Sequence, residues 1–264
     1  MKREEKSAVS RQRILTAAME EISRKGYEGA SLSTLCAEKE ISTLGELISA
    51  AEENMGNEPV PVRITDPKLD PDTMNRALQQ VGGGYLYCGL NKDATAIVCS
   101  APWNMSVEDC LSALAQADAL AESVVSQLIT GDMSDLEKAE ALYAWVTANV
   151  EYDQRYYSDR NAMPYESQTA LGALRDGVAI CGGYSHAVKL LFEKAGIPCF
   201  NVTGTCQGEN HMWNIARIDG QWLWFDAAMG RGSDGQFGFL RFALKELDRN
   251  KYQWNEDSLS SLLD

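Results

Sequence analysis

The chain has 264 residues, of which 45% are hydrophobic and 23% charged, a composition typical of a soluble globular protein rather than a disordered one. Its 24 Lys and Arg residues against 38 Asp and Glu residues give a formal net charge of −14, which argues against a surface that follows nucleic acid, because phosphate binding needs a basic face. Neither a membrane span nor a secretory signal is predicted, since no sufficiently long apolar run is present. The 7 cysteines include no Cys-x-x-Cys pair, which indicates neither a disulfide framework nor a zinc ribbon and favours a reducing cytoplasm.

Residues 1–56 are predicted to form a small helical module, because apolar positions recur there at helical spacing. Three helices are expected in it, over residues 10–25, 31–40 and 43–55. The following stretch, 57–66, contains Pro59 and Pro61 and is expected to be a linker. The remainder, 67–264, is predicted to be a second domain.

The elements of the second domain alternate between helices and strands. In chain order we expect a helix over 71–81, strands over 82–90 and 94–100, a helix over 106–129, a helix from 134, an irregular surface segment over 151–180, a helix over 182–195, a strand over 198–206 and a hairpin over 211–228. Capping boxes are expected where two of the helices begin, at Ser106–Asp109 and at Ser134–Glu137. The buried face predicted for the second of these helices comprises Leu136, Ala139, Tyr143, Val146 and Val150.

Cys181 is a candidate nucleophile. It stands at the start of an amphipathic helix in GVAICGGYSHAVKLLFEKAGI. A helix N-terminus offers unpaired N–H groups and a partial positive charge, which favour thiolate over thiol. Gly182 and Gly183 leave the neighbouring backbone uncovered, so a substrate carbonyl could approach the sulfur closely.

The predicted hairpin brings a histidine and an aspartate together. Asp219-Gly220 between two strand patterns is a strong signal for a two-residue hairpin turn. In the register that this turn sets, His211 and Asp226 are diagonal neighbours on one face of the sheet. Diagonal Cβ atoms lie about 7–8 Å apart, within reach of an imidazole and a carboxylate, and a slip of one residue would separate them. A His–Asp pair is therefore predicted, although its meeting with Cys181 depends on the fold.

Five motifs over about residues 120–255 resemble the transglutaminase-like superfamily, a relative of the papain-type cysteine proteases. They are MSDLEKAEALYAWVTANVEYD, SQTALGALRDGVAICGGYSHA, AGIPC, HMWNIARIDGQWLWFDAAMG and FGFLRFALKELD. The resemblance implies an α+β fold, with a papain-like core in which the nucleophile helix packs on an antiparallel sheet. It also implies a catalytic triad of Cys181, His211 and Asp226. Ala227-Ala228 departs from the Thr-Trp type of pair usual in the family, which places the substrate contacts in question more than the triad.

The activity implied by this resemblance is thiol-dependent acyl transfer on a peptide or glutamine-type amide through a thioester. The expected partners are a peptide or protein substrate and an amine acceptor, with no metal and no cofactor. Hydrolysis and transamidation share every step up to the thioester, so both remain open. Gln168 is the candidate side-chain donor to the oxyanion, beside the backbone N–H of Cys181.

Two further residues near the site have structural alternatives. Trp213 is expected either in the hairpin core or, being beside the triad, in the lining of the substrate cleft. His186 lies on the nucleophile helix, turned away from Cys181, and is expected to pack or to face solvent. With 2 histidines in the chain, this leaves His211 as the base.

The N-terminal segment SRQRILTAAMEEISRKGYEGASLSTLCAEKEIS, roughly residues 10–42, resembles the helix-turn-helix opening of the tetracycline-repressor family. Residues 43–62, where the recognition helix would follow, contain four glutamates and no Lys, Arg or aromatic residue. Such a helix lacks the donors that contact phosphates and base edges, so nucleic-acid binding is not expected. A DNA-binding regulator and an inactive peptide-binding scaffold remain the alternative functions.

Overall fold

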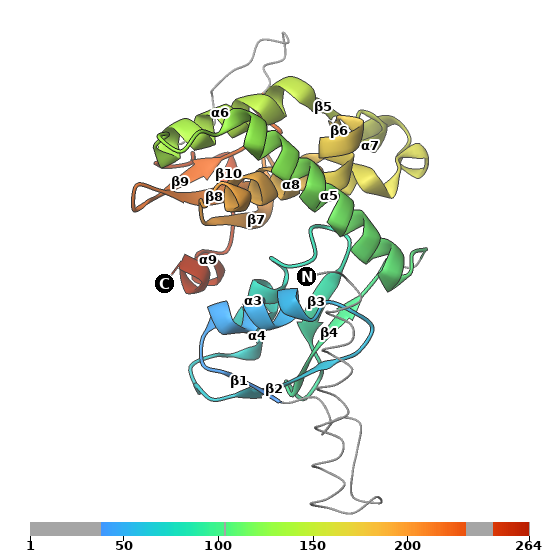
Figure 1. Ribbon diagram of the computed structural model, residues 1–264, viewed down its shortest axis with the longest axis vertical. Helices are drawn as coiled ribbons and strands as arrows, with labels where there is room; N and C mark the ends of the chain where they lie inside the picture. Colours follow the sequence, from blue (N-terminus) through green and yellow to red (C-terminus); the bar gives the residue numbers. More distant parts are fainter. Residues whose placement is uncertain (1–37, 103, 231–244, 264) are drawn as a thin grey trace, which may run out of the picture. The chain divides into compact units, whose positions relative to one another are not determined.

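The computed structural model describes residues 38–102, 104–230 and 245–263 (Figure 1). The described residues divide into two compact units, one formed by residues 38–81 with Cys88–Ser100 and the other by Gly82–Tyr87 with the described residues from 101 onward. The first expected helix and most of the repressor-like segment lie outside the described residues. Within the described part of the chain, no helix has the length and apolar character needed to cross a bilayer.

The first unit contains a four-stranded sheet in the order β1-β2-β4-β3. Its elements are β1 (Lys39–Ile41), α3 (Leu44–Glu53), β2 (Val60–Ile64), α4 (Pro71–Leu78), β3 (Tyr87–Leu90) and β4 (Ala96–Ser100). The third predicted helix is confirmed as α3, where Thr43 and Glu46 form a capping box. The second predicted helix, over 31–40, is wrong at its C-terminal end, because residues 39 and 40 belong to β1.

The predicted linker over 57–66 is also wrong, since this stretch contains β2. Val60 and Val62 are buried, as expected for alternate positions of a strand. The two prolines suggested a linker, but Pro61 pairs only toward β4, opposite Ala96, and the parallel pairing with β1 begins one residue later at Val62. A proline in a strand is tolerated where one side of the backbone is unpaired.

The second unit is an α+β fold, as predicted. Its elements are α5 (Val107–Leu128), α6 (Asp135–Asn149), β5 (Glu151–Tyr152), α7 (Arg155–Ser158), η2 (Arg160–Ala162), η3 (Tyr165–Gln168), η4 (Gly172–Asp176), β6 (Val178–Ala179), α8 (Cys181–Lys194), β7 (Cys199–Cys206), β8 (Glu209–Ile218), β9 (Gln221–Phe225), β10 (Tyr252–Gln253) and α9 (Glu256–Leu263). The sheet has the strand order β10-β7-β8-β9 and is antiparallel throughout. Helix α8 packs on it and is itself covered by α5 and α6 (Figure 1).

Helices α5 and α6 begin where their capping boxes predict. Ser106 and Asp109 cap α5, and Ser134 and Glu137 cap α6, each through reciprocal side-chain to backbone hydrogen bonds. One residue of the predicted buried face of α6 is wrong, because Leu136 lies in the first turn and is 40% exposed. The packed face begins one turn later.

The segment 151–180 is not the irregular surface segment expected. It contains the parallel β5–β6 pair and several short helical turns, and polar residues such as Asp153, Ser167 and Thr169 are buried within it. The polar composition of this segment therefore reflects an internal hydrogen-bond network. Such a network leaves no periodic hydrophobic pattern in the sequence.

Candidate active site

Cys181 is the first residue of α8 and is half-buried. The residue before it, Ile180, supplies no side-chain cap to the helix, in contrast to the capped starts of α3, α5 and α6. The first N–H groups of a helix have no intrahelical acceptor, so those at the start of α8 are directed toward the region of the thiol. This is a suitable setting for an anion that develops next to the sulfur.

Gly183 is required by packing against the chain's own backbone, and Gly182 is closely packed there. A Cβ at Gly183 would lie 2.6 Å from the carbonyl oxygen of Ser167, and one at Gly182 would lie 3.3 Å from that of Gln168. Ile180 also donates its backbone N–H to Ser167 O at 2.8 Å. The space expected for a substrate carbonyl over these two glycines is thus occupied by residues 167 and 168.

The predicted hairpin forms with the predicted register. Ile218 pairs with Gln221 and Asn214 pairs with Phe225 across β8 and β9. His211 Nε2 and Asp226 Oδ2 are 2.9 Å apart, which confirms the His–Asp pair expected from the turn.

The imidazole of His211 also interacts with Cys181, as the pKa of the imidazole indicates. Burial alone would lower the pKa of His211, but hydrogen bonds and charge interactions with Asp226 and Cys181 outweigh burial and raise it to about 10. Nε2 of His211 is the ring nitrogen that faces Asp226. The fold therefore brings together the three residues of the expected triad, in the order thiol, imidazole, carboxylate.

Asp226 is held by groups that sequence reasoning missed. The hydroxyl of Tyr252, on β10, donates to Asp226 Oδ2 at 2.6 Å, and the backbone N–H of Met229 donates to Oδ1 at 3.2 Å. The hydroxyl of Tyr143, on α6, donates to the backbone oxygen of Asp226 at 3.0 Å. The two tyrosines are distant from Asp226 in the sequence, so no local signal could have found them.

Trp213 corrects one expectation, since its side chain is only 1% exposed and belongs to the hydrophobic core. Its ring stacks against that of His211, with centroids 5.8 Å apart, and meets Tyr252 edge to face at 5.2 Å. The Trp213 ring packs against the imidazole from the core side and does not line a substrate cleft. The alternative expectation, a place in the hairpin core, is confirmed.

One tyrosine of the segment 151–180, Tyr152, is influenced by the charge of Cys181. Burial and, next, the charge of Cys181 raise the pKa of Tyr152, which places the two side chains in one environment. Tyr152 stacks on Tyr157, with centroids 5.9 Å apart. Tyr157 is 61% exposed, so the outer ring of this stacked pair faces solvent.

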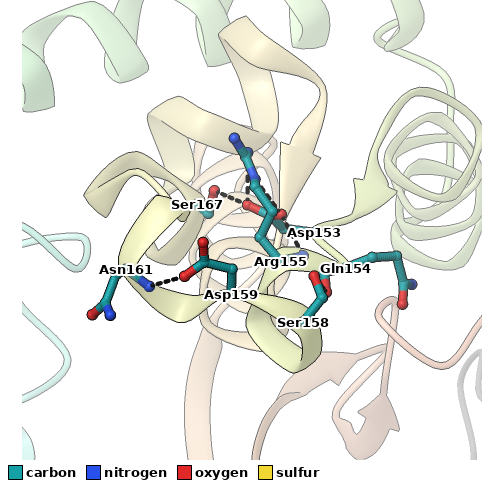
Figure 2. Close-up of polar contacts among 7 residues, drawn as sticks. All are labelled: Asp153, Gln154, Arg155, Ser158, Asp159, Asn161 and Ser167. Carbon is teal, nitrogen blue, oxygen red and sulfur yellow. Dashed lines mark hydrogen bonds and ion pairs between the residues drawn. The ribbon is translucent and has the colours of Figure 1, made fainter.

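A buried carboxylate organises the same segment (Figure 2). Asp153 accepts two hydrogen bonds from the guanidinium of Arg155, at 2.8 and 2.9 Å, and one from the hydroxyl of Ser167 at 2.6 Å. The bonds from Arg155, opposed by burial, lower the pKa of Asp153 to about 2. Ser167 in turn accepts the backbone bond from Ile180, so this network connects directly to the start of α8.

Gln168, the candidate oxyanion donor, ends η3 and is half-buried. Its backbone carbonyl lies against the positions of Gly182 and Gly84. The structure thus places this residue at the start of the nucleophile helix, while the role of its side chain stays a prediction.

His186 is a buried core residue. Of its two expected roles, packing and exposure to solvent, packing is confirmed. Its Nδ1 lies 3.1 Å from Asn201 Nδ2, and burial lowers its pKa to about 4. It is therefore neutral and separate from the triad. Among the described residues, no three His, Cys, Asp or Glu side chains gather in a way that could hold a metal ion.

Part of this chain is similar to proteins of a known family. The sequence model of the Transglutaminase-like superfamily matches residues 122–227. Kyphoscoliosis peptidase of Mus musculus is 25% identical over 133 residues, which cover 44% of this chain and 20% of that protein, and its Homo sapiens counterpart is 24% identical over 123 residues, which cover 42% and 18%. The chain thus spans about a fifth of the length of these curated relatives.

A solved structure described as a TGase aligns with a TM-score of 0.40 and 16% identity, over 74% of this chain and 60% of that one. The family match covers the nucleophile helix and the whole β8–β9 hairpin, including Cys181, His211 and Asp226. Residues 122–227 are therefore a transglutaminase-like domain.

Proposed function

We propose that this protein catalyses thiol-dependent acyl transfer on a peptide or glutamine-type amide, with Cys181 as nucleophile, His211 as proton carrier and Asp226 as the group that orients it. One observation carries the proposal: Nε2 of His211 lies 2.9 Å from Asp226 Oδ2, while the hydrogen bond and charge of Cys181 act on the same imidazole and raise its pKa. A nucleophile, a base and an orienting carboxylate in sequence are the arrangement that activates a thiol.

In the first half-reaction the Cys181 thiolate attacks the amide carbonyl carbon and the carbonyl oxygen becomes an oxyanion. The backbone N–H of Cys181 and the side chain of Gln168 are the proposed donors to that oxyanion. The C–N bond then breaks, and the imidazolium of His211 gives its proton to the departing amine. The product is a thioester on Cys181 and a neutral imidazole.

In the second half-reaction water or a primary amine attacks the thioester. His211 takes a proton from the attacking group, and the thiolate of Cys181 leaves. With water the product is a carboxylic acid, and with an amine it is a new amide. The net charge of −14 favours cationic substrates and amine acceptors through long-range attraction.

The test is the rate of iodoacetamide alkylation at each cysteine, measured by mass spectrometry against pH in the wild type and in His211→Ala. We expect Cys181 to react faster than the other cysteines and to lose that reactivity in His211→Ala, because the imidazolium no longer stabilises the thiolate. Cys206→Ser, a substitution of a buried cysteine, is the matched control and should leave the Cys181 profile unchanged.

Turnover completes the test, with fluorogenic peptides for hydrolysis and a fluorescent primary amine for transamidation. Cys181→Ala and His211→Ala should each abolish turnover while retaining the fold by circular dichroism. If His211→Ala leaves both the alkylation profile and turnover as in the wild type, the proposed mechanism is wrong. A silent Cys181 in the wild type would instead favour the inactive peptide-binding scaffold.

A further inference from the structure

Two thiols face each other in the first unit, far in sequence from the triad. The Sγ atoms of Cys88, on β3, and Cys99, on β4, are 2.8 Å apart. The backbone N–H of Asn91 donates to Ala96 O at 2.9 Å and closes the turn between these strands. Continuing that register along the strands puts Cys88 directly opposite Cys99.

The backbone at this position suits a covalent bond between the two sulfurs. Directly opposed residues alternate between hydrogen-bonded and non-hydrogen-bonded pairs, and counting from the Asn91–Ala96 bond makes the cysteines a non-hydrogen-bonded pair. In such a pair the Cα atoms are about 4.5 Å apart, which falls within the range of about 4.4–6.8 Å spanned by disulfides. Small side-chain rotations are then sufficient to join the sulfurs.

The two thiols differ in acidity and in access to solvent. A hydrogen bond from Cys88 lowers the pKa of Cys99 to about 7, against the effect of burial, and the backbone of Gly56 contributes in the same direction. The same contact, together with burial, raises the pKa of Cys88. Cys88 is only 6% exposed whereas Cys99 is half-buried, so the sulfur that ionises first is also the more accessible one.

We propose that Cys88 and Cys99 form a reversible cross-strand disulfide, with a low-molecular-weight disulfide as the oxidant. The thiolate of Cys99 attacks one sulfur of the small disulfide, which breaks its S–S bond and releases one small thiolate. Cys88 then loses its proton and attacks Cys99 Sγ, which breaks the mixed disulfide and releases the second small thiolate. Two protein thiols are oxidised, the small disulfide is reduced, and the two protons end on the released thiols.

The proposal does not depend on acyl transfer, since neither cysteine belongs to the site around Cys181. It also distinguishes this pair from the other described cysteines. Cys199 and Cys206, for example, begin and end strand β7, with the length of that strand between them.

The experiment exposes the full-length protein to buffers with a rising ratio of oxidised to reduced glutathione, followed by acid quenching, alkylation and non-reducing peptide mapping. Trypsin cuts after Lys92 and separates Cys88 from Cys99, and a glutamate-specific protease cuts after Glu108 and separates Cys99 from Cys110. We expect a peptide containing Cys88 linked to one containing Cys99, in a fraction that rises with the ratio and returns to zero with excess dithiothreitol. Repeating the titration with Cys181→Ser keeps the candidate nucleophile out of the exchange.

Three controls make the result decisive. Cys88→Ser should convert the product into a glutathione adduct on Cys99, because the resolving thiol is gone. Cys206→Ser, which replaces a strand cysteine that is 7% exposed, should leave the linkage unchanged. In urea the preference for the Cys88–Cys99 link should disappear. Full alkylation of both thiols at every ratio, a stable glutathione adduct on Cys99 in the wild type, or links to other cysteines as frequent in buffer as in urea would each overturn the proposal.

Discussion

The β8–β9 hairpin and the segment 151–180 both contribute to the surroundings of Cys181, yet they are built on different principles. The hairpin places His211 and Asp226 through strand register, so two residues separated by a turn meet because backbone pairing is regular. The segment reaches the start of α8 through one buried carboxylate, Asp153, and the hydroxyl of Ser167 (Figure 2). The pairing of His211 with Asp226 thus depends on regular strand register, whereas the position of the α8 start depends on a polar network between residues of the segment.

This difference leads to a separation of effects. Substitutions in the hairpin, or of Tyr252 on β10, which donates to Asp226, should alter protonation and the pH dependence of the reaction. Substitutions in the segment should alter rate and stability, and leave the protonation of His211 as it is. The four predictions below test that separation, from the largest expected effect to the smallest.

Asp226→Asn should reduce kcat/KM by about 10²–10⁴-fold, because it removes the charge that holds and stabilises the imidazolium. Burial then lowers the pKa of His211 from about 10, so the alkaline limb of the pH–rate profile should move to lower pH. A full pH profile of kcat/KM measures both effects. A large loss of rate with an unmoved alkaline limb would show that Asp226 does not control the protonation of His211.

Gln168→Ala should reduce kcat by about 10²-fold with little change in KM, since an oxyanion donor acts in the transition state. The matched control is Gln154→Ala, an exposed glutamine of the same segment. The alkaline limb should stay where it is in the wild type. Equal kinetics for the two variants would show that the Gln168 side chain is not an oxyanion donor.

Asp153→Asn should lower the free energy of unfolding by about 2 kcal/mol, the amount that corresponds to the depressed pKa of this carboxyl, and slow turnover about tenfold through misplacement of the α8 start. A carboxyl whose folded pKa is lowered stabilises the fold above its unfolded pKa, and that stability is lost as the pH falls toward about 2. Urea titrations at several pH values should therefore show the gap between wild type and variant closing in acid. Asp159→Asn, an exposed aspartate that accepts a backbone bond from Asn161, should show no comparable gap.

Tyr252→Phe should slow turnover about three- to tenfold, the effect of one hydrogen bond. Without the tyrosine hydroxyl, the Oδ2 atom of Asp226 is available to His211 alone, so the pKa of His211 should rise and the alkaline limb should move to higher pH. This shift is opposite in sign to that of Asp226→Asn. A shift in the same direction for both variants would contradict the account of how the carboxylate is shared.

The sequence was sufficient for the parts of the molecule that obey short-range rules. Capping boxes located the starts of α5 and α6, and one turn dipeptide set the register that joins His211 to Asp226. It was insufficient where tertiary contacts decide. Pro61 suggested a linker, although it lies in a strand that tolerates it because the backbone of Pro61 is paired toward β4 and not toward β1. Trp213 beside the triad suggested a cleft, although its ring packs against the imidazole from the core. Tyr252 and Asp153 carried no detectable pattern because their partners are chosen by the fold.

The hydrogen bond from Tyr252 to Asp226 also sets an order of events during biosynthesis. The two residues are 26 positions apart, so at about 5–20 residues per second the ribosome adds Tyr252 roughly 1–5 s after Asp226. During that interval Cys181, His211 and Asp226 have all been polymerised, but the strand that completes the carboxylate's environment has not. The nascent chain therefore holds the Asp226 carboxylate without the hydroxyl of Tyr252 until β10 adds to the edge of the sheet.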